Sequence, residues 1–154
     1  MTRTVWMDSP IGVLTLTEKD GFLTGVDFGA KGTPSKEASP LLSEAEKQLE
    51  AYFSGERKTF DLPLKPEGPA FRLRVLEALL KVSYGTAVSY GTLAAMAGSP
   101  GAARAVGQAV HNNPIAVVIP CHRVLGASGK LTGFGGGLDI KRKLLALEGI
   151  PYKE

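Results

Sequence analysis

The chain has a single cysteine, Cys121, and the next residue, His122, is one of its only two histidines. A thiolate is the strongest nucleophile that a side chain offers near neutral pH, and a neighbouring imidazole helps to keep it deprotonated. The pair therefore indicates nucleophilic chemistry at this point of the sequence. A lone cysteine is more often a small core residue, and residues 119–123 by themselves favour that alternative.

Glu148 is a second group that could take part in such chemistry. It ends the last expected helix, 139–148, where a carboxylate faces the unfavourable negative end of the helix dipole. A histidine proton is one candidate to compensate this charge, although a glutamate in such a position is usually solvated. The other side chains of this helix divide by type: Ile140, Leu144, Leu145 and Leu147 are expected to face inward, and Lys141, Arg142 and Lys143 outward.

Two segments on either side must position Cys121. The apolar run 115–119 leads directly to it, so the sulfur is expected where a buried strand ends and a loop begins. The glycine-rich segment 126–137 follows, and glycines allow backbone N–H and C=O groups to approach a ligand closely. This segment is not a phosphate-binding Walker A loop, because the required Gly-Lys-Ser/Thr is missing.

The sequence before Cys121 predicts several helices. Pro69 opens an amphipathic helix, and two shorter helices follow at 90–97 and 102–111. Ser89 is a suitable N-cap for the first of the pair, and residues 99–101, Ser-Pro-Gly, form the turn between them. Two short helices with such a turn match a helix-turn-helix, as many ordinary helical hairpins also do.

The second helix of this pair carries few long side chains. Ala102, Ala103, Ala105, Gly107 and Ala109 are small, and Arg104 is the main long exception. A major-groove recognition helix needs Asn, Gln, Arg or Lys to read base edges, so this helix is poorly suited to reading sequence. It could press against a narrow groove and insert one cation into the base stack. Equally, the small residues could permit tight helix packing, with Arg104 as a surface charge.

The N-terminal half has a different pattern. Alternation and turns between Val5 and Phe28 predict a small antiparallel meander, with strands at 13–17 and 22–28. A helix with one apolar face follows, from about Leu41 to Phe53. None of these residues is arranged for chemistry, so this half is expected to be a scaffold.

Length and composition limit the classes of protein. The 154 residues fit one domain or two small lobes, with 44% hydrophobic and 21% charged residues as in globular chains. The proline-punctuated segment 60–69 is a plausible linker, so we expect domains at 1–64 and 65–154. No apolar stretch is long enough to span a membrane and no signal core precedes Trp6.

The cysteine and charge counts add to these limits. One cysteine allows no internal disulfide and suits a reducing, cytoplasmic location. One cysteine and two histidines do not favour a closed zinc site, and neither a metal nor another cofactor is expected. The net charge of +3 permits a polyanionic partner without requiring one.

Several motifs taken together resemble those of the O6-alkylguanine-DNA alkyltransferases. They are Pro-Cys-His-Arg-Val at 120–124, Arg-Ala-Val-Gly at 104–107, Asn113-Pro114, Gly-Gly-Leu at 136–138 and Glu148. Their order and spacing are kept from about Phe71 to Gly149, while the N-terminal half matches only at 9–12 and Leu14. The resemblance implies an α/β (α+β) fold: a small ribonuclease-H-like N-terminal lobe with an antiparallel sheet, and a mostly helical C-terminal lobe with a helix-turn-helix.

The resemblance also implies a function, the irreversible transfer of the alkyl group from O6-alkylguanine in DNA to Cys121. Cys121 would attack the alkyl carbon of a flipped guanine, and His122 would act through a water as base for the thiol. Glu148 would orient the imidazole. Tyr90 would donate a hydrogen bond to guanine N3, so that guanine leaves as a neutral base. Repair of O4-alkylthymine and the preferred alkyl size stay open.

Other positions receive roles in DNA and base binding from the same resemblance. The DNA-binding residues would be Arg104, which replaces the extruded nucleotide, together with Tyr90, Ala102, Ala103 and Gly107. The pocket would be formed by Val124, Phe134, Gly135 and Gly136, with the carbonyls of Cys121 and Val124 accepting from the guanine amino group. Asn113 would brace the turn before the active site.

The chain also departs from the family pattern. Leu76 and Ser83 stand where the family often has Trp and Pro, at packing or turn positions. Phe134 and Gly135 stand where some members have Tyr and Ser, so a hydroxyl donor to O6 is lost and backbone N–H groups are left to take its place.

Three other classes of function are alternatives to transfer. An alkyltransferase-like protein that binds lesions without catalysis would lack the nucleophile, which Cys121 supplies here. A Cys-His-Glu hydrolase would need an oxyanion hole. In addition, the catalytic Cys and His of such hydrolases are usually not adjacent in the sequence. A transcription factor that uses the helix-turn-helix would need a second helix with more side chains able to read base edges. The expected partner is double-stranded DNA containing O6-alkylguanine. No membrane partner is expected, and the protein is expected to act as a monomer, with cooperative binding on DNA left open.

Overall fold

The computed structural model describes residues 1–37, 39–134 and 136–154. The chain divides into two compact units, one made of Met1–Glu67 with Pro114–Val118 and the other of Gly68–Asn113 with Ile119–Glu154. Within the described ranges, no helix is both long and apolar enough to cross a membrane.

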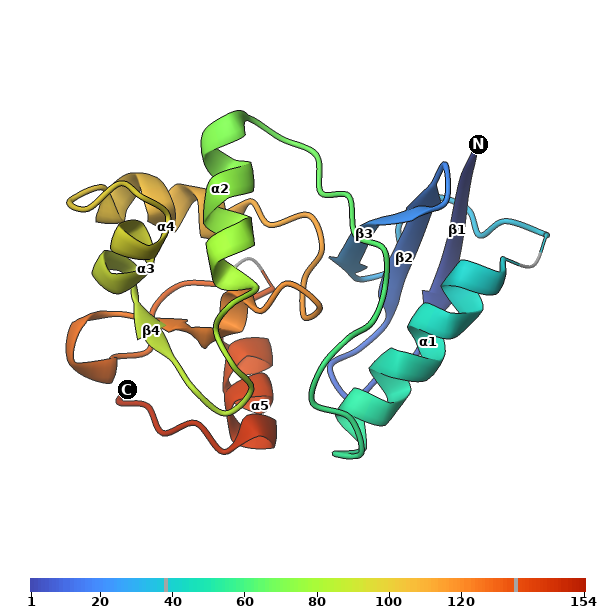
Figure 1. The fold of residues 1–154 in the computed structure, drawn as a ribbon. Coiled ribbons are helices and arrows are strands. Elements are labelled where there is room, and N and C mark those ends of the chain that lie inside the picture. The colour runs from blue at the N-terminus through green and yellow to red at the C-terminus, as the bar shows by residue number, and fades with distance from the viewer. Residues whose placement is uncertain (38, 135) are drawn as a thin grey trace. The chain divides into compact units, whose positions relative to one another are not determined.

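An antiparallel sheet forms the first unit, in the order β1 (Thr2–Met7), β2 (Leu14–Lys19) and β3 (Phe22–Phe28) (Figure 1). The turn between β2 and β3 is formed by Asp20 and Gly21, which have φ angles of 51° and 85°. Two residues with positive φ match the right-handed twist of adjacent strands, and Asp-Gly is a preferred pair for this turn. The expected meander is confirmed.

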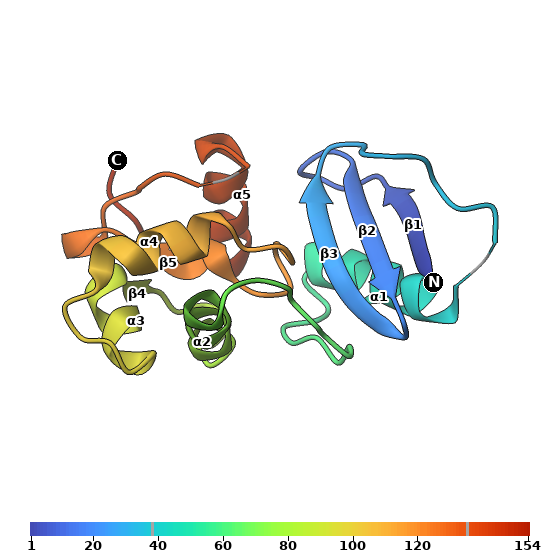
Figure 2. The ribbon, with the colours of Figure 1, turned by 90° about the horizontal axis from the view of Figure 1, so that it is seen from above.

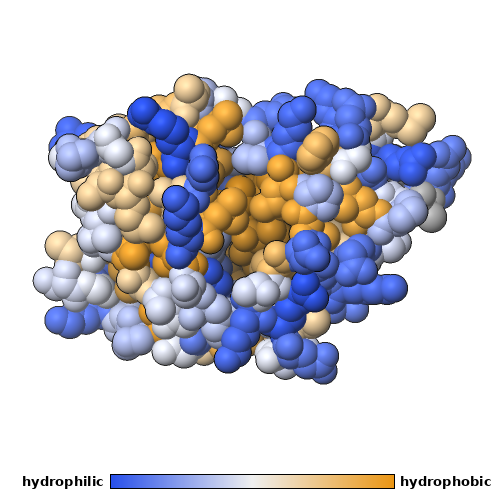
Figure 3. All heavy atoms as spheres, viewed as in Figure 1, coloured by the Kyte–Doolittle hydropathy of each residue, from blue (hydrophilic) through white to orange (hydrophobic). Residues whose placement is uncertain are grey.

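Helix α1 (Pro40–Phe53) covers one face of this sheet, as Figures 1 and 2 show. The side chain of Ser39 accepts a hydrogen bond from the Leu42 N–H, and a proline occupies the first turn, so the helix begins where the local chemistry favours it. Its buried residues are Leu42, Ala45, Gln48, Leu49 and Tyr52. The surface over α1 in Figure 3 is mostly hydrophilic, which is the amphipathic pattern expected for a surface helix.

The segment Pro114–Val118 joins the first unit through β3. The Val26 N–H donates to the Pro114 carbonyl at 3.0 Å, and the Ala116 N–H donates to the Val26 carbonyl at 3.1 Å. The expected strand over 115–119 is wrong, although the run is buried as expected. Only Ile115 bridges β3, and a turn follows in which Val117 has a φ of 69°, a conformation that interrupts an extended chain.

The second unit is mostly helical. Its elements are α2 (Ala70–Leu79), β4 (Val88–Ser89), α3 (Tyr90–Met96), α4 (Ala103–His111), the 3₁₀ turns η1 (Cys121–Arg123) and η2 (Ala127–Gly129), β5 (Val124–Leu125) and α5 (Leu138–Glu148). Strands β4 and β5 form a short parallel pair. In Figure 2, where α2 is seen end-on, α4 lies across it and across α3. The expected mixed fold, with an antiparallel N-terminal sheet and a helical C-terminal part, is confirmed.

The helix-turn-helix is formed by α3 and α4. The side chain of Ser89 accepts from the Thr92 N–H and caps α3, as expected. The Ala102 N–H donates to the Ser99 carbonyl at 3.1 Å, which closes the turn before α4. Ala102 is the N-cap of α4 and makes no side-chain cap hydrogen bond.

Helix α5 begins at Leu138, one residue before the expected start, and one of its lysines is buried rather than exposed. Gly137 is the N-cap, and Asp139 lies in the first turn, where its charge is favourable for the helix dipole. The expectation that Lys141 faces outward is wrong, because its exposed fraction is only 1%. Lys141 lies three and seven residues before Leu144 and Glu148, so it shares their buried face.

Candidate active site

Cys121 is the first residue of η1 rather than the end of a strand. Its N–H donates to the Ile119 carbonyl at 2.8 Å, and the Arg123 N–H donates to the Pro120 carbonyl at 3.0 Å. These bonds form a tight turn that holds the thiol in a fixed place. The residue is buried, with an exposed fraction of 5%.

Next to it, His122 and Glu148 form a buried contact. His122 Nε2 lies 2.6 Å from Glu148 Oε2, and neither side chain is exposed. Burial lowers the pKa of His122, and this effect outweighs the hydrogen bond and the charge of Glu148, which raise it. A neutral imidazole follows, in which Nε2–H donates to the carboxylate and Nδ1 is the basic nitrogen. The compensation of Glu148 by a histidine, one of the two alternatives left open by the sequence, is the one found.

The Glu148 carboxylate also binds Arg123, a residue to which the sequence assigned no role. Arg123 Nε lies 2.8 Å from Oε1 and Nη2 lies 3.1 Å from Oε2, while Nη1 donates to the Val82 carbonyl at 2.7 Å. The Gly85 N–H adds a bond to Oε1 at 3.0 Å. Donors thus approach both carboxylate oxygens, which holds Glu148 in one orientation at the buried end of α5.

A second missed residue is the buried Lys141. Its Nζ donates to the Val124 carbonyl at 2.6 Å and to the Thr132 carbonyl at 3.2 Å, and it lies 3.5 Å from Thr132 Oγ1. Burial lowers the pKa of Lys141 to about 8, against a smaller raising effect from the charge of Cys121. The spacing of Lys141 from Leu144 and Glu148 along α5 was the signal that could have revealed it.

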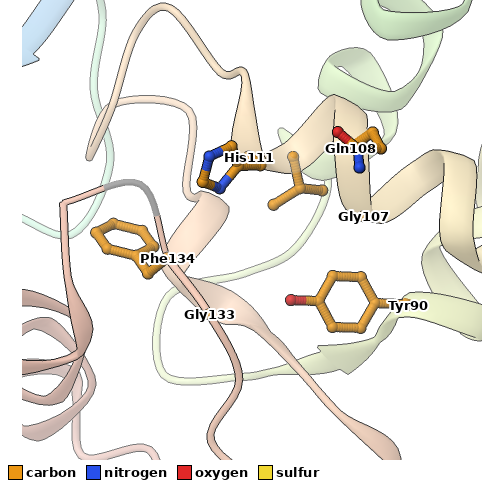
Figure 4. Close-up of a pocket in the computed structure, with 7 residues that line it drawn as sticks. Tyr90, Gly107, Gln108, His111, Gly133 and Phe134 are labelled. Atoms are coloured by element: carbon orange, nitrogen blue, oxygen red, sulfur yellow. The ribbon is translucent and has the colours of Figure 1, made fainter.

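A pocket of about 360 Å³ lies in the second unit (Figure 4). Its lining residues are Tyr90, Gly107, Gln108, Val110, His111, Gly133 and Phe134. The hydroxyl of Tyr90 points into the pocket toward Gly133, and the rings of His111 and Phe134 lie at its other side. The Tyr90 hydroxyl oxygen lies 2.9 Å from Thr132 Oγ1. The walls therefore combine flat rings with a phenol, which suits a planar ligand with polar edges.

The structure brings some of the residues expected at the pocket together and not others. Phe134, Gly107 and Tyr90 line it. Among the described residues, Val124 is buried in β5 and Gly136 is half-buried, and neither is part of that lining. Gly135 lies outside the described residues. Cys121 is likewise buried and is not part of the lining.

The residues expected to contact DNA lie on and before α4. Ala102 precedes the helix and Ala103 begins it, while Arg104 is exposed one residue later. One turn further along α4, on nearly the same side, Gly107 faces the ring of Tyr90: a Cβ added there would lie 3.8 Å from two ring carbons. Tyr90 thus lies beside α4 at Gly107, and Arg104 is a long exposed cation on the same helix.

Asn113 connects the end of α4 to the turn before Cys121. Asn113 Nδ2 donates to the Ile119 carbonyl at 2.9 Å, which links the end of α4 to the residue whose carbonyl also accepts from Cys121. No group of three or more His, Cys, Asp or Glu residues that could hold a metal ion occurs in the ranges that the structure describes.

Comparison with known proteins matches both halves of the chain to one family. The 6-O-methylguanine DNA methyltransferase ribonuclease-like domain matches residues 3–66, and the DNA binding domain of the same family matches residues 70–150. The second match contains Cys121, His122, Glu148, Tyr90 and both helices of the helix-turn-helix.

Individual relatives agree with this. A methylated-DNA–protein-cysteine methyltransferase of Mycolicibacterium paratuberculosis is 52% identical over 151 residues, which cover 95% of this chain and 90% of that protein. One of Methanosarcina acetivorans is 48% identical, with 92% and 95% covered. Among solved structures, Mycobacterium tuberculosis O6-methylguanine methyltransferase superposes with a TM-score of 0.87 at 48% identity, covering 96% of this chain and 93% of the other. Mycobacterium tuberculosis OGT in complex with DNA gives a TM-score of 0.85 at 49% identity, with 96% and 91% covered.

Proposed function

The chain belongs to the 6-O-methylguanine DNA methyltransferase family, and we propose that it repairs double-stranded DNA by transferring the alkyl group from O6 of guanine to the sulfur of Cys121. Each molecule acts once, because the thioether that forms has no route back to a thiol. The observation that carries the proposal is a buried cysteine, Cys121, followed directly by His122, whose ring is held by Glu148. All three residues lie in the matched DNA-binding domain.

The reaction needs a thiolate and a proton for the departing guanine. Neutral His122 can take the thiol proton on Nδ1, through a water, because Nε2 is occupied by Glu148. The sulfur then forms a bond to the alkyl carbon while the bond from that carbon to O6 breaks. The proton lost by Cys121 balances the proton gained by guanine, which leaves as the neutral base. No cofactor enters this balance.

Tyr90 supports the leaving group in this scheme. Its hydroxyl points into the pocket, where a flipped guanine with N3 toward Tyr90 would receive a hydrogen bond. Negative charge develops on guanine as the bond to O6 breaks, so a donor at N3 lowers the barrier more than it stabilises the bound base. Phe134 offers a ring face on which the base can stack.

Base flipping explains the side chains of α4. A repair protein must act in any sequence context, and a helix of small residues can approach the minor groove without reading base edges. Arg104, which is exposed, fills the space in the stack that the flipped nucleotide leaves, while Ala102, Ala103 and Gly107 allow the close approach. Flipping costs a few kcal/mol and is cheapest for a poorly paired base, which favours the damaged guanine.

The remaining site residues have supporting roles. Asn113 braces the turn before Cys121 through the Ile119 carbonyl. The Val124 carbonyl, proposed to accept from the guanine amino group, already accepts from Lys141, and a second lone pair remains for the base. Gly136 is proposed to contribute backbone to the base pocket. We place the boundary between the lobes at 64/65 and the protein in the cytoplasm, acting as a monomer.

The test is transfer of label from a duplex that contains O6-[methyl-³H]guanine. Wild-type protein should become labelled and stop at one equivalent, with the label on the peptide that contains Cys121. Cys121→Ala should take up no label and should still bind the duplex in a gel-shift assay, which separates loss of chemistry from loss of folding. Label on Cys121→Ala, or continued turnover by the wild type, would overturn the proposal. Lesion-dependent binding without any labelling would instead indicate a non-catalytic lesion-binding protein or regulator.

A further inference from the structure

Three polar side chains form a hydrogen-bonded row from the core of the second unit to the pocket. The row begins at the Nζ of Lys141, which is buried, and continues to Thr132 Oγ1 at 3.5 Å. From Thr132 Oγ1 it reaches the Tyr90 hydroxyl at 2.9 Å. Tyr90 alone of the three lines the pocket.

The first member of the row sets the direction of the others. A lysine ammonium has three N–H donors and no acceptor, so Lys141 can only donate to Thr132. With one lone pair of its oxygen engaged by Lys141, the Thr132 hydroxyl can give its own proton to the oxygen of Tyr90. The proton of Tyr90 is then available to the pocket, and donors that point the same way strengthen one another.

The opposite arrangement would remove the donor from the pocket. If Tyr90 donated to Thr132, the phenol would offer the pocket only lone pairs. Lys141 opposes this arrangement because its positive charge lies on the Thr132 side of Tyr90. It repels a hydroxyl proton of Tyr90 that points toward Thr132 and attracts the lone pairs of the Tyr90 oxygen. Its two other bonds, to the Val124 and Thr132 carbonyls at 2.6 and 3.2 Å, hold the ammonium and the backbone of Thr132 in place.

We propose that Lys141 and Thr132 are positioning residues that turn the hydroxyl proton of Tyr90 into the pocket, where it is donated to an acceptor atom on the edge of the bound base. The inference rests on the proposed function, since it concerns the leaving group of the same reaction. It adds two residues that do not touch the base: Thr132, which acts through Tyr90, and Lys141, which orients Thr132 and also donates to the Val124 carbonyl. The ring of Tyr90 lies beside Gly107 of α4, where an added Cβ would be 3.8 Å from two ring carbons.

Thr132→Val tests the row with little change of shape, because valine replaces the hydroxyl by a methyl group. We expect single-turnover transfer from O6-methylguanine duplex to slow about three- to tenfold, the range for one hydrogen bond in the transition state. Thr132→Ser should restore the rate to within about twofold of the wild type, since the hydroxyl returns. Thr24→Val, at a half-buried threonine of β3 in the other unit, is the matched control and should leave the rate unchanged.

Tyr90→Phe separates positioning from a general structural role. If Thr132 acts through Tyr90, Thr132→Val should cause no further slowing in the Tyr90→Phe background. Slowing by the same factor in both backgrounds, or a wild-type rate for Thr132→Val, would overturn the proposal. Lys141→Met should slow transfer in the same way, and a thermal melt identifies any variant that has merely unfolded. If the wild-type protein takes up no label, the proposed function itself is wrong. If the wild type is labelled but Thr132→Val reacts at the same rate, only the role of Thr132 and Lys141 is wrong.

Discussion

The guanidinium of Arg123 holds both carboxylate oxygens of Glu148, with Nε 2.8 Å from Oε1 and Nη2 3.1 Å from Oε2. Both side chains are almost completely buried. The residue next to the proposed base therefore neutralises the group that orients that base. Since a buried carboxylate without its partner is costly, the pair ties the stability of the unit to the geometry of the active site.

Arg123→Met should therefore destabilise the protein strongly. It leaves a carboxylate buried with His122 and the Gly85 N–H but without a guanidinium, and such a loss typically costs about 3–5 kcal/mol. Urea unfolding followed by circular dichroism measures the change. Arg142→Met is the control: Arg142 pairs with Asp139 and Glu154 at the surface and should have little effect. Similar stabilities for the two variants would contradict the expected role of Arg123.

Arg104→Ala should slow transfer from duplex DNA far more than the dealkylation of free O6-benzylguanine. The exposed side chain of Arg104 is needed only where a nucleotide leaves a base stack, and the free base has none. Parallel rate measurements on the two substrates provide the test. Equal slowing on both would indicate that Arg104 acts on folding or on the shape of the pocket.

Binding to undamaged duplexes should depend on salt and only weakly on sequence. Helix α4 exposes a single arginine, Arg104, together with Ala105, Gln108 and His111, so affinity should come mainly from phosphates, and log affinity should fall linearly with log salt. Fluorescence anisotropy with Cys121→Ala and several unrelated duplexes measures both dependences. Discrimination above about tenfold would favour a sequence-reading regulator, because one wrong base at a specific site already costs about 1–3 kcal/mol.

Methylation of Cys121 should lower the melting temperature. The residue is 5% exposed, and its turn is tied to Asn113 through the Ile119 carbonyl, so little room is available for another methyl group. Overpacking of this kind typically costs about 1–3 kcal/mol. Larger groups from benzyl lesions should destabilise the protein further. Melting of the methylated form at or above the temperature of the free form would show that the thiol has space beside it.

Lys141 should make the stability depend on pH in a defined window. Its pKa in the folded protein is about 8, below its ordinary value of 10.5. Between these values the unfolded chain binds more protons than the folded one, so the contribution of Lys141 to the free energy of unfolding rises with pH across the window. Below the window, Lys141 is charged in both states and burial of that charge opposes folding.

The comparison of Lys141 with Lys141→Met isolates this effect. Both proteins should carry Cys121→Ala, because the charge of Cys121 acts on Lys141. The stability of the protein with Lys141, relative to that with Met, should increase between pH 8 and 10.5. A decrease would mean that the ammonium is favoured by its three oxygen partners more than burial disfavours it.

Local signals in the sequence predicted the elements of the fold well. The antiparallel meander, the Ser89 cap and the helix pair that it begins depend on neighbours a few positions away, so residue type and periodicity reveal them. The expected strand before Cys121 failed for a tertiary reason: the run is buried as a strand would be, but only Ile115 reaches β3.

Long-range pairing explains what the sequence left out of the candidate site. The charge of Lys141 predicts an outward side chain, although its position on α5 is that of a core residue. The acceptors that permit its burial lie on Val124 and Thr132. Arg123 lay inside the recognised motif, yet its role depends on Glu148, 25 residues away. Periodicity predicts on which face of a helix a side chain lies. It does not predict which distant residue will bind a charged side chain that faces inward.

The membership of Pro114–Val118 in the first unit has a consequence for dissecting the protein. The chain passes between units three times, at 67/68, 113/114 and 118/119, so a protease cut at 67/68 leaves two fragments that still share a folded region. A gene fragment that starts at Gly68 would encode Ile115 without the β3 edge that receives it, two residues from the unit boundary and six from the nucleophile. The segment that leads to the reactive sulfur therefore depends on the first unit for its backbone hydrogen bonds to Val26, and the two halves should be expressed as one chain.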